Sequence, residues 1–112
     1  MALERGKLSN VVQVSDGSTS SIIACASSKT VYIKSIICHQ PSETNATAQV
    51  YFVPNGGSAG TTTKLFDVEV NAGETVLLEP AYPLVLETSG DSLHGGADAS
   101  TINFLITGDK ES

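Results

Sequence analysis

Residues 31–39 read Val-Tyr-Ile-Lys-Ser-Ile-Ile-Cys-His, and residues 46–54 read Ala-Thr-Ala-Gln-Val-Tyr-Phe-Val-Pro. Both stretches are rich in β-branched and aromatic residues, which favour strands over helices. In the second stretch, small or apolar side chains recur at every other position from Ala46 to Phe52, the period of a strand with one face in a core. The first stretch is apolar on both faces, which predicts a central strand. Residues 40–45, Gln-Pro-Ser-Glu-Thr-Asn, are typical of a loop between the two strands.

The same pattern extends from these two strands in both directions, with turn-forming residues about every 8–15 positions. Further strands are expected over residues 8–14, 21–26, 64–70, 76–78, 84–86, 93–97 and 102–107. No stretch keeps the spacing of an amphipathic helix beyond one turn. A length of 112 residues fits one domain. The predicted fold is therefore all-β: a single antiparallel β-sandwich, Ig-like or jelly-roll-like, of about seven or eight strands.

The sandwich is assigned to residues 11–108. Residues 1–10 are polar and are expected to form an N-terminal arm, and residues 109–112 a C-terminal tail. The core is expected to be mainly aliphatic, because the sequence has no Trp and three Phe. Alternation places all three Phe side chains, Phe52, Phe66 and Phe104, in that core. Cys25 and Cys38 lie within apolar strand patterns, which favours buried free thiols over a disulfide.

The charge of the chain argues against several classes of partner. The net charge is −6, whereas binding to nucleic acid depends on Lys and Arg. No apolar run approaches the roughly 20 residues that cross a bilayer, and the first residues lack the apolar centre of a secretion signal. We therefore expect synthesis in the cytoplasm and neither nucleic acid nor membrane as a partner. Residues 1–66 carry +2 and residues 67–112 carry −8, so unlike charges on two copies could meet.

A search for catalytic chemistry finds little. Only His39 and His94 are available as imidazole bases. Ser92, His94 and Asp91 are the residue types of a Ser-His-Asp catalytic relay. However, residues so close together in an extended segment point to alternating faces of the strand. The spacing of His94, Asp91 and Asp98 matches no known metal site, and phosphate-loop and nucleophile-elbow motifs are missing from the sequence. The sequence thus predicts no catalytic, cofactor-binding or metal-binding residues, and a protein that is not an enzyme.

The sequence contains candidate residues for contacts with other protein chains. Tyr32, Tyr51, Val53 and Leu105 fall on strand faces opposite those that fill the expected core. Some of these side chains could complete the second layer of the sandwich. The others are candidate subunit contacts, because aromatic residues left at a surface are favoured in interfaces.

Four stretches, residues 31–38, 48–60, 70–78 and 84–93, resemble small virion proteins of tailed bacteriophages. The likeness lies in a strand, a Pro-Asn-Gly-Gly hairpin, an Ala-Gly-Glu turn and a Gly-Asp turn. These elements fall between residues 31 and 108, a span of about two-thirds of the chain. The resemblance implies a non-enzymatic virion component: a capsid decoration (cement) protein, or a neck, tail or baseplate accessory.

The resemblance and the charge pattern together set the expected partners. Such a protein would be made in the host cytoplasm and reside in the virion. It would bind copies of itself, expected as a trimer, and other virion proteins such as the major capsid protein. No cofactor is implied. The alternative function is a receptor- or carbohydrate-binding β-sandwich module.

Overall fold

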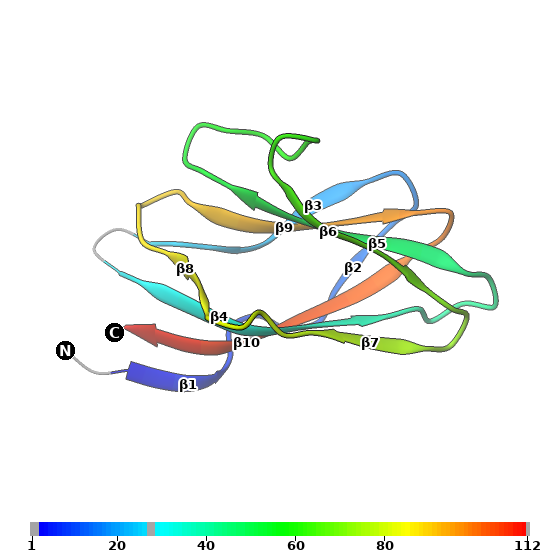
Figure 1. Cartoon of the computed structure of the whole chain (residues 1–112), viewed down its shortest axis with the longest axis horizontal. Helices are drawn as coiled ribbons and strands as arrows, with labels where there is room; N and C mark the ends of the chain where they lie inside the picture. The colour runs from blue at the N-terminus through cyan, green and yellow to red at the C-terminus, as the bar shows by residue number, and fades with distance from the viewer. Residues whose placement is uncertain (1–2, 27–28, 112) are drawn as a thin grey trace.

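The computed structural model describes residues 3–26 and 29–111, and these form two antiparallel sheets packed face to face (Figure 1). In the described part of the chain, no helix is long and apolar enough to cross a membrane. The strands are β1 (Leu3–Lys7), β2 (Val12–Val14), β3 (Thr19–Ala24), β4 (Val31–His39), β5 (Ala46–Val53), β6 (Lys64–Val70), β7 (Thr75–Leu78), β8 (Leu84–Leu86), β9 (Ser92–Asp98) and β10 (Ile102–Glu111).

The strands pair as a series of nested hairpins. The innermost pair is β5 with β6, and around it β4 pairs with β7 and β8, β3 with β9, and β2 with β10. This nesting divides the strands between a six-stranded sheet, ordered β1-β10-β4-β7 with β2 on β10 and β8 on β4, and a four-stranded sheet, ordered β3-β9-β5-β6. A ribbon of nested hairpins rolled into two sheets is a jelly roll. The predicted antiparallel β-sandwich is confirmed, and of its two forms the jelly roll is the one observed. The described residues form ten strands instead of the expected seven or eight.

The core lies between the two sheets and is filled by alternate side chains. Burial in β4 and β10 follows the period of two, and aliphatic residues such as Ile36 and Ile106 are completely covered. Phe104 is buried, while Phe52 and Phe66 are partly buried and pack against the same cluster. Both cysteines are buried free thiols, as the sequence predicts.

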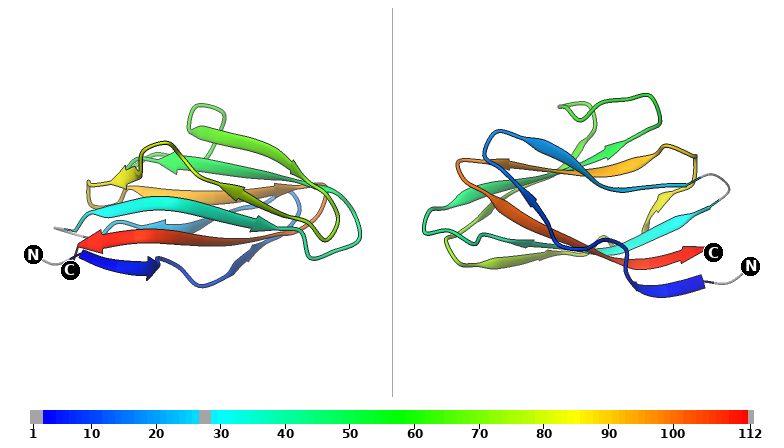
Figure 2. Two further views of the ribbon diagram at one scale, coloured as in Figure 1. Left: turned by 60° about the horizontal axis from the view of Figure 1, so that its bottom comes forward. Right: turned by 180° about the vertical axis from the view of Figure 1, so that it is seen from behind.

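The expected arm and tail are corrected by the structure. Residues 3–7 of the expected arm form β1, which pairs with the end of β10 from Leu3 opposite Glu111 to Lys7 opposite Thr107. β10 itself continues to Glu111, beyond the expected end of the sandwich at residue 108. The physical reason is that an edge strand is held by its backbone, so charged side chains do not prevent pairing. Figure 2 shows β1 alongside β10, with both chain ends at the same corner.

A glycine lets β10 bend as it continues along β4. The register between the two strands shifts between Thr107 and Gly108. A Cβ atom at Gly108 would overlap the carbonyl oxygen of Tyr32, so only glycine fits this close approach of two backbones. At the bulge, Lys34 of β4 forms an ion pair of 2.8 Å with Asp109 of β10.

Candidate functional site on the six-stranded sheet

The four candidate contact residues lie on two different surfaces. Tyr32 and Leu105 point outward from the six-stranded sheet, because their neighbours Ile33 and Phe104 point into the core. Tyr51 and Val53 belong to β5 in the four-stranded sheet. The structure therefore does not bring the four residues together.

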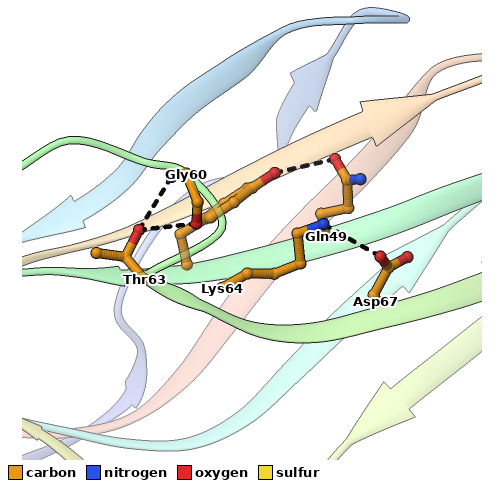
Figure 3. Close-up of polar contacts among 6 residues, drawn as sticks. Gln49, Gly60, Thr63, Lys64 and Asp67 are labelled. Atoms are coloured by element: carbon orange, nitrogen blue, oxygen red, sulfur yellow. Dashed lines mark hydrogen bonds and ion pairs between the residues drawn. The ribbon is translucent and has the colours of Figure 1, made fainter.

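Tyr51 and Val53 are not available as surface contacts, since only 6% of Tyr51 and 3% of Val53 is exposed. The connection between β5 and β6, residues 54–63, folds back over the outer face of the four-stranded sheet, and we call it the covering loop (Figures 1 and 3). The hydroxyl of Tyr51 donates a hydrogen bond of 3.1 Å to Oε1 of Gln49 beneath this loop. This expectation from the sequence is wrong, because alternation indicates the face of a side chain and not what covers that face.

The covering loop is held at both ends. Near its C-terminal end, the Thr63 hydroxyl accepts a hydrogen bond from the Gly60 amide and can donate to the carbonyl oxygen of Gly60 or Ser58 (Figure 3). Near its start, the Asn55 amide donates to Oδ1 of Asp91, at 3.0 Å, across 36 residues of sequence. The covering loop is therefore fixed by specific hydrogen bonds.

Tyr32 lies in the charged half of the outer face of the six-stranded sheet. Its hydroxyl donates a hydrogen bond of 3.0 Å to Oε1 of Glu111. This hydrogen bond, with desolvation and the negative charges of Glu111 and Glu87, raises the pKa of Tyr32. The pairing in β4 and β10 sets Tyr32 opposite Asp109, which binds Lys34. Tyr32 is therefore held within a network of charges.

Leu105 lies in the apolar half of the same face. The registers of β10, β4 and β7 place Leu105 opposite Ile37 and Ile37 opposite Leu77, so the three side chains form one line across the sheet. Val11, just before β2, lines a shallow hollow of about 220 Å³ together with Ile37 and Leu105. We call Val11, Ile37, Leu77 and Leu105 the apolar row. Val11 is 62% exposed and Leu77 is 52% exposed, so water contacts much of this surface.

Polar groups flank the apolar row at both sides. Towards the connection of β4 and β5, the imidazole Nδ1 of His39 lies 2.9 Å from the Thr75 hydroxyl, and the side-chain amide of Gln13 donates to Oδ1 of Asn103 at 3.0 Å. On the other side, the hydroxyls of Ser35 and Thr107 share a hydrogen bond, and Lys7 of β1 lies opposite Thr107. An apolar centre with a polar border is the arrangement of a protein–protein interface.

The remaining candidates for chemistry are occupied by structural roles. Both oxygens of the Asp91 carboxylate accept backbone hydrogen bonds, from Asn55 and from Thr88. His94 lies in β9 opposite Ser21 and Tyr51, and burial lowers its pKa. Within residues 3–26 and 29–111, no group of three or more His, Cys, Asp or Glu side chains could hold a metal ion.

The two cysteines are protected by burial. Burial raises the pKa of Cys38 to about 12. Burial and the negative charge of Asp91 also raise the pKa of Cys25, whose thiol lies 3.0 Å from the carbonyl oxygen of Lys29. Since the thiolate is the reactive form, both thiols are poor nucleophiles in the folded chain.

The sequence singled out Leu105 but not the rest of the apolar row. A signal for Ile37 was present, because residues 31–39 are apolar on both faces while only one face of β4 meets the other sheet. Leu77 follows the same logic in the run Val76-Leu77-Leu78, where the two flanking residues are more covered than Leu77. Val11 lies inside the strand expected over residues 8–14 but outside β2, which begins only at Val12.

Comparison with known proteins shows where this architecture occurs. No protein-family model matches the sequence, and no curated protein matches it. Among solved structures, a subunit of Bacillus endospore appendages, described as a novel family of disulfide-linked pili, aligns with 98% of this chain and 88% of its own length at 15% identity and a TM-score of 0.54. The likeness is one of fold.

A protein in the structure of infectious bursal disease virus, Gx strain, shares the same fold. It aligns with 97% of this chain at 14% identity and a TM-score of 0.51. This chain spans 31% of the length of that viral protein. At such identities, the shared feature is the arrangement of strands in the sandwich.

Proposed function

We propose that this chain is a non-enzymatic virion structural protein of a tailed bacteriophage. It acts as a capsid decoration (cement) protein, or as a neck or tail accessory, and binds the particle through repeated subunit contacts. The observation that carries the proposal is the apolar row, an exposed apolar line on the outer face of the six-stranded sheet. The fold shared with a protein in the structure of infectious bursal disease virus and with a protein of Bacillus endospore pili supports an assembly role.

A protein with such a role needs only a modest affinity at each contact. An apolar strip the width of three strands gives a modest affinity, and repetition of the contact on a symmetric particle multiplies it into strong overall binding. We propose that copies associate through the apolar row as a closed ring of three, with Leu105 in the contact and Tyr32 near its charged border. The major capsid protein, or another virion protein, provides the surface on which the ring docks. The protein is then made in the host cytoplasm and found in the virion.

Leu77 provides the sharpest test, because the chain contains a matched control. Leu77 is 52% exposed in the apolar row, and Leu65 is 49% exposed on the outer face of the four-stranded sheet. We expect Leu77→Glu to abolish the ring of three and binding to virions, and Leu65→Glu to leave both intact. Sedimentation velocity at several concentrations, and co-sedimentation with particles that lack the protein, measure the two effects.

Salt provides a second test of the same contact. Because the apolar row carries no charge, its association should survive about 0.5 M salt, where the Debye length shrinks to about 4 Å. Equal loss with Leu77→Glu and Leu65→Glu would contradict the assigned surface. A chain that stays monomeric at every concentration and binds no virion part would favour receptor or carbohydrate binding instead.

A further inference from the structure

The edges of the four-stranded sheet differ in how they are protected. This sheet ends at β3 on one side and at β6 on the other. An edge strand exposes backbone groups that can pair with another chain, and proteins block such edges with charged residues or proline. β6 carries Lys64, Asp67 and Glu69, whereas β3 reads Thr-Ser-Ser-Ile-Ile-Ala. The sequence contains neither charge nor proline from residue 17 to residue 28, so β3 lacks this protection.

The backbone of β3 has groups directed away from its neighbour. In the described residues, β3 pairs with β9 alone. The carbonyl oxygen of Ser18 accepts a hydrogen bond from the Ala97 amide of β9, at 3.2 Å. Since residues of an antiparallel strand alternate in direction, Thr19 and Ser21 direct their N–H and C=O groups outward. Both residues are exposed, so they can form hydrogen bonds with a further strand.

A hollow of about 470 Å³ adjoins this edge. It lies where the end of β3 faces the six-stranded sheet. Its lining has an apolar part, which consists of Leu8, Ile23, Ala24, Ala26 and Val31, and a charged part, which consists of Lys29, Lys110 and Glu111. A strand placed alongside β3 would shield part of this lining from water. The edge therefore offers both backbone hydrogen bonds and an apolar gain to a partner strand.

We propose that β3 pairs with β3 of a second copy, antiparallel about a two-fold axis at Ser20, so that two four-stranded sheets become one continuous sheet. In this register Thr19 of one copy and Ser21 of the other exchange backbone hydrogen bonds, before the bulge that bends β3 between Ser21 and Ile23. This inference rests on the proposed assembly function and adds a second contact to it.

Charge identifies the partner as a second copy of the same strand. About a two-fold axis, a strand meets its own sequence reversed, so each charged residue faces residues of the same segment. For β6, Asp67 and Glu69 would lie among the same two acids of the second copy, which is repulsive. Because β3 has no charge, its self-pairing has no such cost. The apolar row and the β3 edge lie on different sheets, so a copy can use both contacts at once.

Paired charge substitutions test the proposal. Thr19→Lys/Ser21→Lys and Thr19→Glu/Ser21→Glu each place four like charges around the axis, and each should weaken the β3 contact more than about tenfold. A mixture of the two variants sets Lys against Glu and should restore the contact. The matched control is Thr61→Lys/Thr62→Lys, which adds the same charge at exposed positions of the covering loop and should change nothing.

Sedimentation velocity of each variant, with thermal unfolding to confirm that each is folded, gives the result. We expect the wild type to contain pairs of rings, the Lys and Glu variants single rings, and Leu77→Glu only pairs of chains. Association of the Lys variant as strong as the wild type, or failure of the mixture to restore it, would overturn the β3 contact. If the β3 contact is overturned in this way but Leu77→Glu still fails to form the ring of the wild type, the proposed function stands without the β3 contact. A wild type that is monomeric throughout overturns both.

Discussion

Phe104 should contribute more to stability than any other single side chain, because its ring spans the space between the two sheets. It is the largest of the fully buried side chains, with 1% of its surface exposed. On its own sheet it lies between Val12 of β2 and Cys38 of β4. Across the core, a Cβ atom added at Gly95 of β9 would lie 2.8 Å from its Cε2 atom. The ring therefore occupies the space that a side chain at Gly95 would need.

Phe104→Ala should destabilise the domain by about 3–5 kcal/mol, the usual cost of lost burial plus the cavity left by an aromatic ring. A domain of this size is stable by about 5–15 kcal/mol, so the variant should still fold but melt about 10–20 °C lower. Far-UV circular dichroism in urea, at one protein concentration, measures the loss. An unchanged slope with denaturant would show that both folded states bury similar surface.

Gly95 provides the control for this reasoning. Gly95→Ala alone should cost about 1–3 kcal/mol, because its methyl group meets the ring in a filled core. In the Phe104→Leu background the ring is gone, and the same change should cost less by more than about 0.5 kcal/mol. A loss below about 1 kcal/mol for Phe104→Ala, or strictly additive costs in this cycle, would show that the ring and Gly95 do not touch and that the packing of β9 on β10 is wrong.

Three further predictions concern the bulge, the buried thiol and the covering loop. Gly108→Ala should destabilise by about 3 kcal/mol in a urea melt, because its methyl group would overlap the Tyr32 carbonyl. Burial raises the pKa of Cys38 from 9.0 to about 12, so stability should be full below about pH 9 and fall as pH rises towards 12, and Cys38→Ala should flatten this fall. Asp91→Ala should cost about 1.5–3 kcal/mol and open the covering loop to limited proteolysis, because the Asn55 amide loses its acceptor.

Strands with clear alternation could be predicted almost residue by residue. The bounds of β4, β6 and β8 agree with those expected from the sequence, and β5 differs by one residue. For each of these strands, the apolar residues and the flanking turn residues indicate the same first and last residue. Which strands pair could not be predicted, because nesting β2 on β10 joins residues about 90 positions apart and depends on the whole chain folding over itself. The sequence therefore left Ig-like and jelly-roll-like arrangements open.

β1 was missed for a different reason. Its sequence, Leu-Glu-Arg-Gly-Lys, has no apolar period, because β1 lies at the outer edge of the sheet and is held through backbone hydrogen bonds with β10. Period-two analysis detects strands whose sequence has an apolar face, and it does not detect a strand without one. The bulge at Gly108, after which β10 continues beyond the expected end of the domain, could not be detected from side-chain alternation either.

The contrast between Tyr51 and Ile37 shows what decides which outward residues remain free. Both point away from the core, and by composition the aromatic Tyr51 is the better contact residue. Tyr51 is buried on the outer face over which the covering loop folds, and its ring lies against Gly96. The start of this loop is anchored at the Gly90-Asp91 turn: the Asp91 carboxylate binds the Asn55 amide, and a side chain at Gly90 would collide with Asn55. The hairpin and the Gly-Asp turn, distant in sequence, thus form one unit that covers the four-stranded sheet. The opposite sheet has no such anchored loop over Ile37 among the described residues, so the surface left for a partner is the apolar row.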